Sequence, residues 1–168
     1  MLHKERVCSM FKQLEPHKRI DFMCGMLNLC HPFELRFFGS YVEDLAKKDF
    51  NSLREAEGKA NNRNELTKCI EADDKSFRSK VAVYLALLKS SSRTCANFIY
   101  DMLENHIQKS LSVISDMDEP TVLNILLVLA MAMNHPAFQY SQKMRMYDWY
   151  ENAKKAAEQI LKVILQEI

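Results

Sequence analysis

The stretch VLNILLVLAMAM, from Val122 to Met133, decides the fold class of this chain. It is apolar on every side of a helix except at Asn124, which is the pattern of a helix surrounded by other helices. It is well short of the ~20 apolar residues that a membrane-spanning helix needs. His135 and Pro136 follow it, and the residue before a proline is disfavoured in the helical region. We therefore expect a buried central helix.

Amphipathic helical patterns fill the chain on both sides of this stretch, and the alternation typical of strands is almost absent. Pro16 and Pro32 mark the starts of two early helices, because proline is tolerated in the first helical turn. A short amphipathic helix follows, in which Ser52 and Glu55 are spaced like a capping box, and residues 61–64 end it. The pattern predicts one all-α domain over residues 1–168, a compact bundle of about seven or eight helices. The third helix is expected to turn one stripe towards the core: Leu35, Phe38, Val42 and Leu45.

Composition excludes several classes of function. The 168 residues include only 3 Gly, which leaves almost no place for a phosphate-binding loop or a nucleophile elbow, and makes dinucleotide folds and most all-β folds poor candidates. The 23 Lys+Arg nearly balance the 22 Asp+Glu, so no basic region marks a nucleic-acid or lipid surface. The sequence predicts no enzyme, although an unrecognised helical enzyme stays a competing hypothesis.

The cysteines indicate free thiols in a reducing compartment. Their number, 5, is odd and none forms a C-x-x-C pair. Cys24, Cys30 and His31 are the only local cluster, and helical geometry does not bring them to one point, so neither a metal nor another cofactor is expected. A Cys–His nucleophile pair assembled across the fold is disfavoured, because no glycine-containing oxyanion loop lies beside any cysteine. With no signal-type apolar segment after the charged N-terminus, we expect a cytosolic protein or a piece of one.

Aromatic residues gather at the start of the last helix, which begins at about Ser141. Tyr147 and Trp149 cannot both point the same way, so one of them is expected to face outward. Exposed Trp, Tyr, Met and Arg is the composition of a protein-binding hot spot, and a second packing layer explains it equally well. Trp149 is therefore a candidate partner-binding residue.

Three segments carry a family resemblance: RIDFMCGMLNLC over 19–30, PFELRFFGS over 32–40 and EDLAKKD over 43–49. They resemble the N-terminal helical domain of the animal CCHC zinc-knuckle proteins two and fourteen, and matching motifs continue in order to about residue 145. More distantly, the layout with its late His135-Pro136-Ala137 is similar to the N-terminal domain of Smaug-type translational repressors. Phe38 and Tyr41 stand where these proteins usually carry Leu and Cys, which indicates that side chains of different size fill the same part of the core. The RNA-reading SAM domain and the zinc knuckle of these proteins are absent, so direct RNA recognition is not carried over.

The resemblance implies an adaptor that acts in cytoplasmic mRNA control. It also implies a location that includes ribonucleoprotein granules and a role in germline development. Its implied partners are a noncanonical cytoplasmic poly(A) polymerase or RNA-binding and repressor proteins, with no membrane and only indirect contact with RNA. Whether the mRNA tail is lengthened or shortened stays open. Matched exposed charges are the first candidates for partner binding, because packing does not require them. They are Arg36, Glu43, Asp44, Lys47, Lys48, Asp49, Arg54 and Glu57.

Alternatives remain for these residues and for the chain. Asp44, Lys47 and Asp49 could instead tie adjacent helices together. The chain could be a homodimerisation module, with the apolar residues between 160 and 168 pairing with a second copy or folding back on the bundle. It could also be a direct RNA-binding domain, whose affinity would fall steeply with salt.

Overall fold

The computed structural model describes the backbone of residues 3–68 and 74–166, and the side chains of residues 3–68 and 76–160. Helices make up its regular structure, and this part of the chain contains no strand. The all-α fold class is therefore confirmed. The helices in chain order are α1 (Lys4–Gln13), α2 (Pro16–Asn28), α3 (Pro32–Ala46), the 3-10 turn η1 (Lys47–Asp49), α4 (Phe50–Ala60), α5 (Arg63–Thr67), α6 (Asp74–Leu87), α7 (Arg93–Ser112), the 3-10 turn η2 (Ile114–Asp116), α8 (Glu119–Asn134) and α9 (Tyr140–Gln166).

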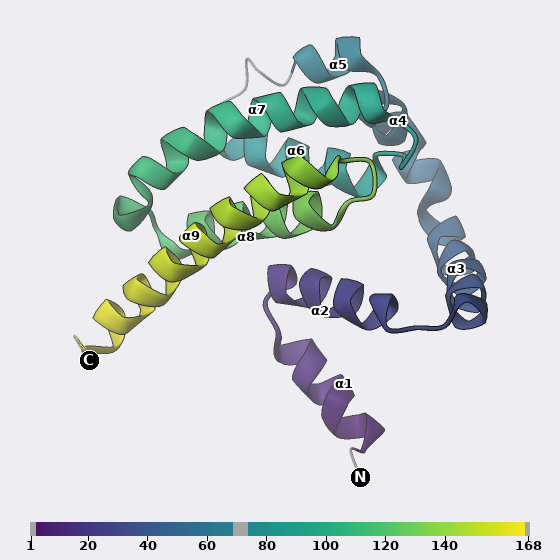
Figure 1. The fold of residues 1–168 in the computed structure, drawn as a ribbon, viewed down its shortest axis with the longest axis horizontal. Coiled ribbons are helices and arrows are strands. Elements are labelled where there is room, and N and C mark those ends of the chain that lie inside the picture. The colour runs from purple at the N-terminus through teal and green to yellow at the C-terminus, as the bar shows by residue number, and fades with distance from the viewer. Residues whose placement is uncertain (1–2, 69–73, 167–168) are drawn as a thin grey trace.

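Helix α8 is the centre of the body, as its uniformly apolar sequence predicts (Figure 1). It packs against α9, α2 and α6. Each Å² of apolar area that is removed from water stabilises the fold by roughly 25 cal/mol. The buried side chains of α8 therefore contribute strongly to the stability of the core. Seven of its residues are buried: Val122, Ile125, Leu126, Val128, Leu129, Ala130 and Ala132.

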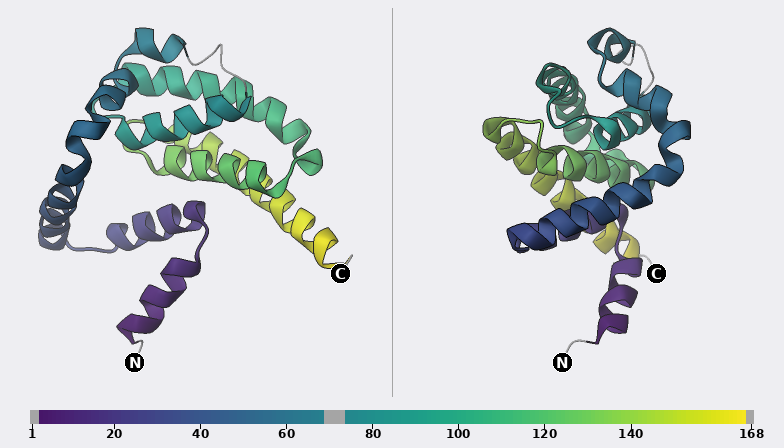
Figure 2. Two further views of the ribbon diagram at one scale, coloured as in Figure 1. Left: turned by 180° about the vertical axis from the view of Figure 1, so that it is seen from behind. Right: turned by 90° about the vertical axis from the view of Figure 1, so that its right-hand side faces the viewer.

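Helices α1–α3 form an arm that leaves the body. Figure 2 shows α3 standing at one end of the molecule and α1 projecting below the body, while α2 lies beside α8. Neither α1 nor α3 has a buried residue. The expectation that α3 turns a stripe towards the core is wrong: Val42 is 59% exposed and Leu45 46%. The chain changes direction between α2 and α3, so the apolar side of α3 stays largely exposed.

Two local expectations concern α4 and its surroundings. Residue Asn61 ends α4 as predicted, and Asn62 then starts the short α5, where its side-chain oxygen accepts the Asn64 backbone N–H at 3.0 Å. The capping box of Ser52 and Glu55 is wrong, because the Ser52 hydroxyl donates to the Asp49 carbonyl at 2.8 Å from inside α4. The sequence also offers Asp73 or Asp74 as the cap of the next helix. Asp73 lies outside the described residues, and Asp74 is the first residue of α6.

Candidate protein-interaction surface

The charged candidates lie along the corner formed by α3, η1 and α4. Glu43 and Asp44 are on the last turn of α3, Lys47 to Asp49 make up η1, and Arg54 lies on α4. All of these residues are exposed. Arg36 lies about two helical turns before Glu43. Six of the eight charged candidates thus share one exposed corner. Arg36 lies farther along α3, and Glu57 is described next.

Ion pairs separate these candidates into two groups. The Lys47 ammonium is 3.7 Å from the Asp44 carboxylate, and both side chains are mostly exposed. A pair of this kind contributes about 0–1 kcal/mol, so it holds no helices together. Glu57 is different, because its carboxylate lies 3.4 Å from the ammonium of Lys89, which follows α6, and is only 34% exposed. Glu57 therefore links α4 to the body, whereas the ion pair of Asp44 and Lys47 is exposed and joins residues three apart in the chain.

Trp149 is not on the surface. It is 6% exposed and stacks on Tyr100 of α7, with ring centroids 5.9 Å apart, while the guanidinium of Arg145 lies over its ring. Of the two aromatics that could not face the same way, Tyr147 is the outward one, at 47% exposed. The placement of Trp149 among the partner-binding residues is corrected: it belongs to the α7–α9 packing layer.

A wide apolar surface on α3 is exposed, although four of its residues, Leu35, Phe38, Val42 and Leu45, were expected to face the core. Successive residues of an α-helix lie about 100° apart around the helix axis. The seven exposed apolar residues of α3 therefore cover roughly 200° of its circumference, about twice the width of the apolar stripe on an ordinary surface helix. Phe33 is 87% exposed and Phe37 68%. The width of this apolar arc on a helical wheel was the signal in the sequence that could have identified the exposed surface. We call this surface the α3 apolar face, and it consists of Phe33, Leu35, Phe37, Phe38, Tyr41, Val42 and Leu45.

The polar side of α3 is narrow. Arg36, Ser40 and Glu43 share it, and the Ser40 hydroxyl donates to the Arg36 carbonyl at 3.3 Å. Glu34 interrupts the apolar arc near its start, where its carboxylate accepts the His31 backbone N–H at 2.6 Å and so caps the helix. The charged candidates therefore border an apolar surface.

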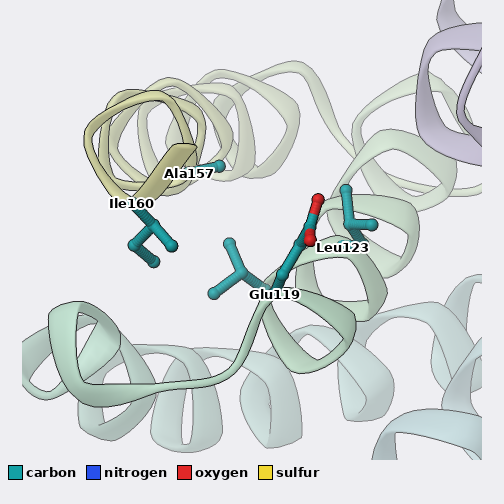
Figure 3. Close-up of a pocket in the computed structure, with 5 residues that line it drawn as sticks. Glu119, Leu123, Ala157 and Ile160 are labelled. Atoms are coloured by element: carbon teal, nitrogen blue, oxygen red, sulfur yellow. The ribbon is translucent and has the colours of Figure 1, made fainter. Parts of the chain in front are cut away.

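The cavity between α8 and α9 does not resemble a substrate site. Figure 3 shows a notch between α8 and α9 with Glu119 and Leu123 on one side and Ala157 and Ile160 on the other. Its volume of about 20 Å³ is far below the ~300–1,000 Å³ of ligand pockets. Ile160, the first of the apolar residues near the C-terminus, is here half-buried and packs back on the body. The side chains that follow it lie outside the described residues.

A wider apolar hollow of about 400 Å³ lies between α1, α2 and α8. Cys24 lines it, and burial raises the pKa of this thiol, which favours the protonated and less nucleophilic form. Four cysteines in the described part are free thiols, and Cys69 lies outside it. Among the described residues, no group of three His, Cys, Asp or Glu could hold a metal ion. None of the described helices combines the length and apolarity needed to cross a membrane.

Two histidines of the body, His106 and His135, both have structural roles. The ring of His106 stacks on Phe77, with centroids 3.7 Å apart. The Nδ1 atom of His135 accepts the Ala137 backbone N–H at 3.1 Å, and its Nε2 lies 3.1 Å from the Leu88 carbonyl. Because Nδ1 accepts, the proton is on Nε2, which donates to Leu88. Burial lowers the pKa of His135, so this neutral form is favoured.

Two family models match the chain in adjoining segments. The model of the SMAUG-like PHAT domain matches residues 53–158, more than half of the chain. The model of the RNA-binding protein vts1-like domain matches residues 4–48. The first segment covers most of α4–α9 and the second covers α1–α3. The resemblance to a Smaug-like N-terminal helical domain is thereby confirmed, and the finer resemblance to the zinc-knuckle proteins stays a prediction.

Proposed function

Because the chain belongs to the SMAUG-like PHAT domain family, we propose that it is a protein-interaction domain that acts as an adaptor within a post-transcriptional regulator of mRNA. It links an RNA-binding protein to machinery that modifies the poly(A) tail or controls translation. In this proposal the chain is no enzyme, acts in the cytoplasm and contacts RNA only indirectly. Its proposed protein partners are a noncanonical cytoplasmic poly(A) polymerase or a repressor protein.

The exposed α3 apolar face is the observation that supports this proposal. Monomeric soluble proteins rarely leave a large continuous apolar surface open to water, and such surfaces mark sites of interaction. In addition, an isolated helix of 15 residues is marginally stable in water. A partner that covers α3 therefore gains apolar burial and also stabilises the helix itself.

The surroundings of this face define the partner's chemistry. Helix-in-groove recognition places the apolar side of an amphipathic helix against a hydrophobic surface. Phe33, Phe37 and Tyr41 supply the large apolar contacts, and the corner with Asp44, Lys47 and Arg54 supplies charges of both signs at the rim. We expect the partner to present an apolar helix or helix pair flanked by mixed charges.

Self-association is a second candidate function, and the width of the apolar arc favours it. A single helix covers only part of an arc of roughly 200°. A second copy offers the same face, and a two-fold arrangement buries both faces against each other in one self-complementary interface. The arm would then dimerise the regulator, and the charged corner would remain open to other proteins.

Paired substitutions on α3 test both functions. Phe37→Ser with Tyr41→Ser removes the centre of the apolar face at positions that are 68% and 58% exposed, so the body should stay folded. Gly39→Ala with Ser40→Gln on the polar side is the matched control, because both residues are exposed and neither is a candidate for partner binding. Light scattering after size exclusion measures the mass, and nuclease-treated pull-downs measure recovery of a poly(A) polymerase or of repressor subunits.

The outcomes separate the hypotheses. If the serine pair halves the mass of the particle and the control does not, the face is a dimer interface. If it abolishes nuclease-resistant recovery of these partners without changing the mass, the face binds the partner directly. If neither quantity changes, the α3 apolar face is not the interaction surface. Recovery that disappears with nuclease would make RNA the ligand and the adaptor proposal wrong.

A further inference from the structure

His17 occupies the contact between the arm and the body. It lies in the first turn of α2, directly after Pro16, and its side chain is 2% exposed. Its ring meets the Tyr150 ring of α9 edge-on, with centroids 6.1 Å apart and planes at 61°. A histidine of the arm is thus buried against the last helix of the body, and it is the only buried residue of α2.

The Nδ1 atom of His17 is buried and has no hydrogen-bond partner among the described residues. A neutral imidazole tolerates this when Nδ1 is the unprotonated nitrogen, because the cost is one unpaired acceptor. An imidazolium carries a proton on both nitrogens, so it would bury a charged donor with no acceptor. Burying a charge without a hydrogen-bonded partner is far more costly than burying a neutral ring.

Charged groups around His17 do not remove this cost. Its own helix and N-cap supply two anions and one cation, Glu15, Asp21 and Lys18. From α9, Tyr150 is buried and Lys154 adds a second cation, 3.7 Å from the carboxylate of Glu151. On α8, the other helix that packs against α2, Glu119 in the first turn is the one titratable side chain. No carboxylate among these forms a hydrogen bond with the Nδ1 atom of His17.

We propose that His17 is an acid-sensitive latch at the contact of α2 with α9, which strengthens the packing of α2 on the body, mainly on α8, when the ring is neutral and weakens that packing when the ring is protonated. In the closed state the neutral ring packs against Tyr150. In the open state His17 is solvated, and its imidazolium is hydrated instead of buried. The proposal concerns the α2–α9 contact alone and does not depend on what binds the α3 apolar face.

The direction of the pH effect follows from burial. Burial is the main cause that lowers the pKa of His17 in the closed state below its ordinary 6.5, and Lys18 acts in the same direction. The open state therefore binds a proton at a higher pH than the closed state does. As pH falls below about 6.5, opening becomes more favourable by up to about tenfold per pH unit until the closed state also protonates. Above that pH the latch is shut.

Two measurements on the same chain test the latch. A proton NMR titration of the His17 ring should give a pKa below 6.5. Hydrogen exchange, corrected for the intrinsic pH dependence of exchange, should show α2 protection falling about tenfold between pH 7.5 and pH 5.5, relative to α8. His17→Phe keeps a buried aromatic ring and cannot titrate, so its α2 protection should change less than twofold. His135→Gln is the control and should keep the response, since it leaves His17 in place.

The latch is wrong if His17 titrates at or above 6.5, or if His17→Phe loses α2 protection as the parent chain does. Retained α2 protection in the parent chain at pH 5.5 would also overturn it. Should His17→Phe fail to fold, His17→Gln takes its place, because a neutral amide likewise carries no proton to titrate. The NMR titration of the unaltered chain needs no variant, and it decides the sign of the pKa shift by itself.

Discussion

The hydroxyl of Ser92 donates a 2.7 Å hydrogen bond to the side-chain oxygen of Asn61, 31 residues earlier in the chain. The same oxygen accepts the Lys89 backbone N–H at 2.9 Å, and the Asn61 amide donates to the carbonyls of Glu57 and Leu87 at 2.9 and 3.0 Å. One half-buried amide thus joins the end of α4 to the turn between α6 and α7.

We predict that Asn61→Ala destabilises the protein by about 2–3 kcal/mol, because it leaves several partly buried backbone groups unpaired. Urea unfolding followed by circular dichroism measures this change. Asn62→Ala is the matched control, since Asn62 only caps α5 with one hydrogen bond, and it should cost about 1 kcal/mol. Equal losses for the two variants would show that Asn61 has no special role.

The pH dependence of stability should reflect His135 as well as His17. Burial lowers the pKa of His135 in the folded chain below its ordinary 6.5. The unfolded chain then binds the proton at a higher pH, so the stabilisation is complete above about 6.5 and declines as pH falls towards the folded pKa. Urea midpoints at pH 7.5 and 5.5 should differ less in His135→Gln than in the parent chain. An undiminished pH response would contradict this assignment.

Trp149 and Tyr147 should behave in opposite ways. Trp149→Ala removes a 6% exposed side chain from the α7–α9 layer, and large-to-small changes of this kind cost about 3–5 kcal/mol. Tyr147→Ala alters a half-exposed side chain and should change stability by about 0.5 kcal/mol or less. Differential scanning calorimetry of both variants measures the contrast. A strongly destabilised Tyr147 variant would show that the outward position of this ring is misassigned.

The exposed charges should matter for partner binding and not for folding. Asp44→Ala breaks an exposed ion pair, which is worth at most about 1 kcal/mol, and Arg54→Ala changes an exposed side chain. Thermal melting should therefore hold in both variants, while recovery of the protein partner drops. Melting temperatures lowered by many degrees in both would mean that these residues act in packing.

Much of the fold is predictable from the periodicity of apolar residues. The central position of α8 follows from its uniformly apolar sequence, because a helix with no polar face is stable only when it is covered on all sides. The ends of helices at Asn61 and His135 follow from local backbone chemistry. The charged corner around Asp44 could also be predicted from the sequence, because packing does not explain exposed charges in a matched family motif.

Other features depend on contacts between segments distant in the chain. The hydrogen bonds of Asn61 require the end of α4 to meet the turn between α6 and α7. The burial of Trp149 requires α7 and α9 to come together. No local pattern encodes either meeting. The burial of His17 likewise exists only because α2 returns to the body, where its ring meets Tyr150.

Helix α3 shows where this division lies. Its sequence determined that it is helical, where it begins, and that Phe37 and Tyr41 share one side, because these properties depend on spacing and on local capping. Whether that side is covered depended on the path of the chain after α2, which carries α3 away from the body. Periodicity records which residues share a face, but it holds no information on what lies opposite that face.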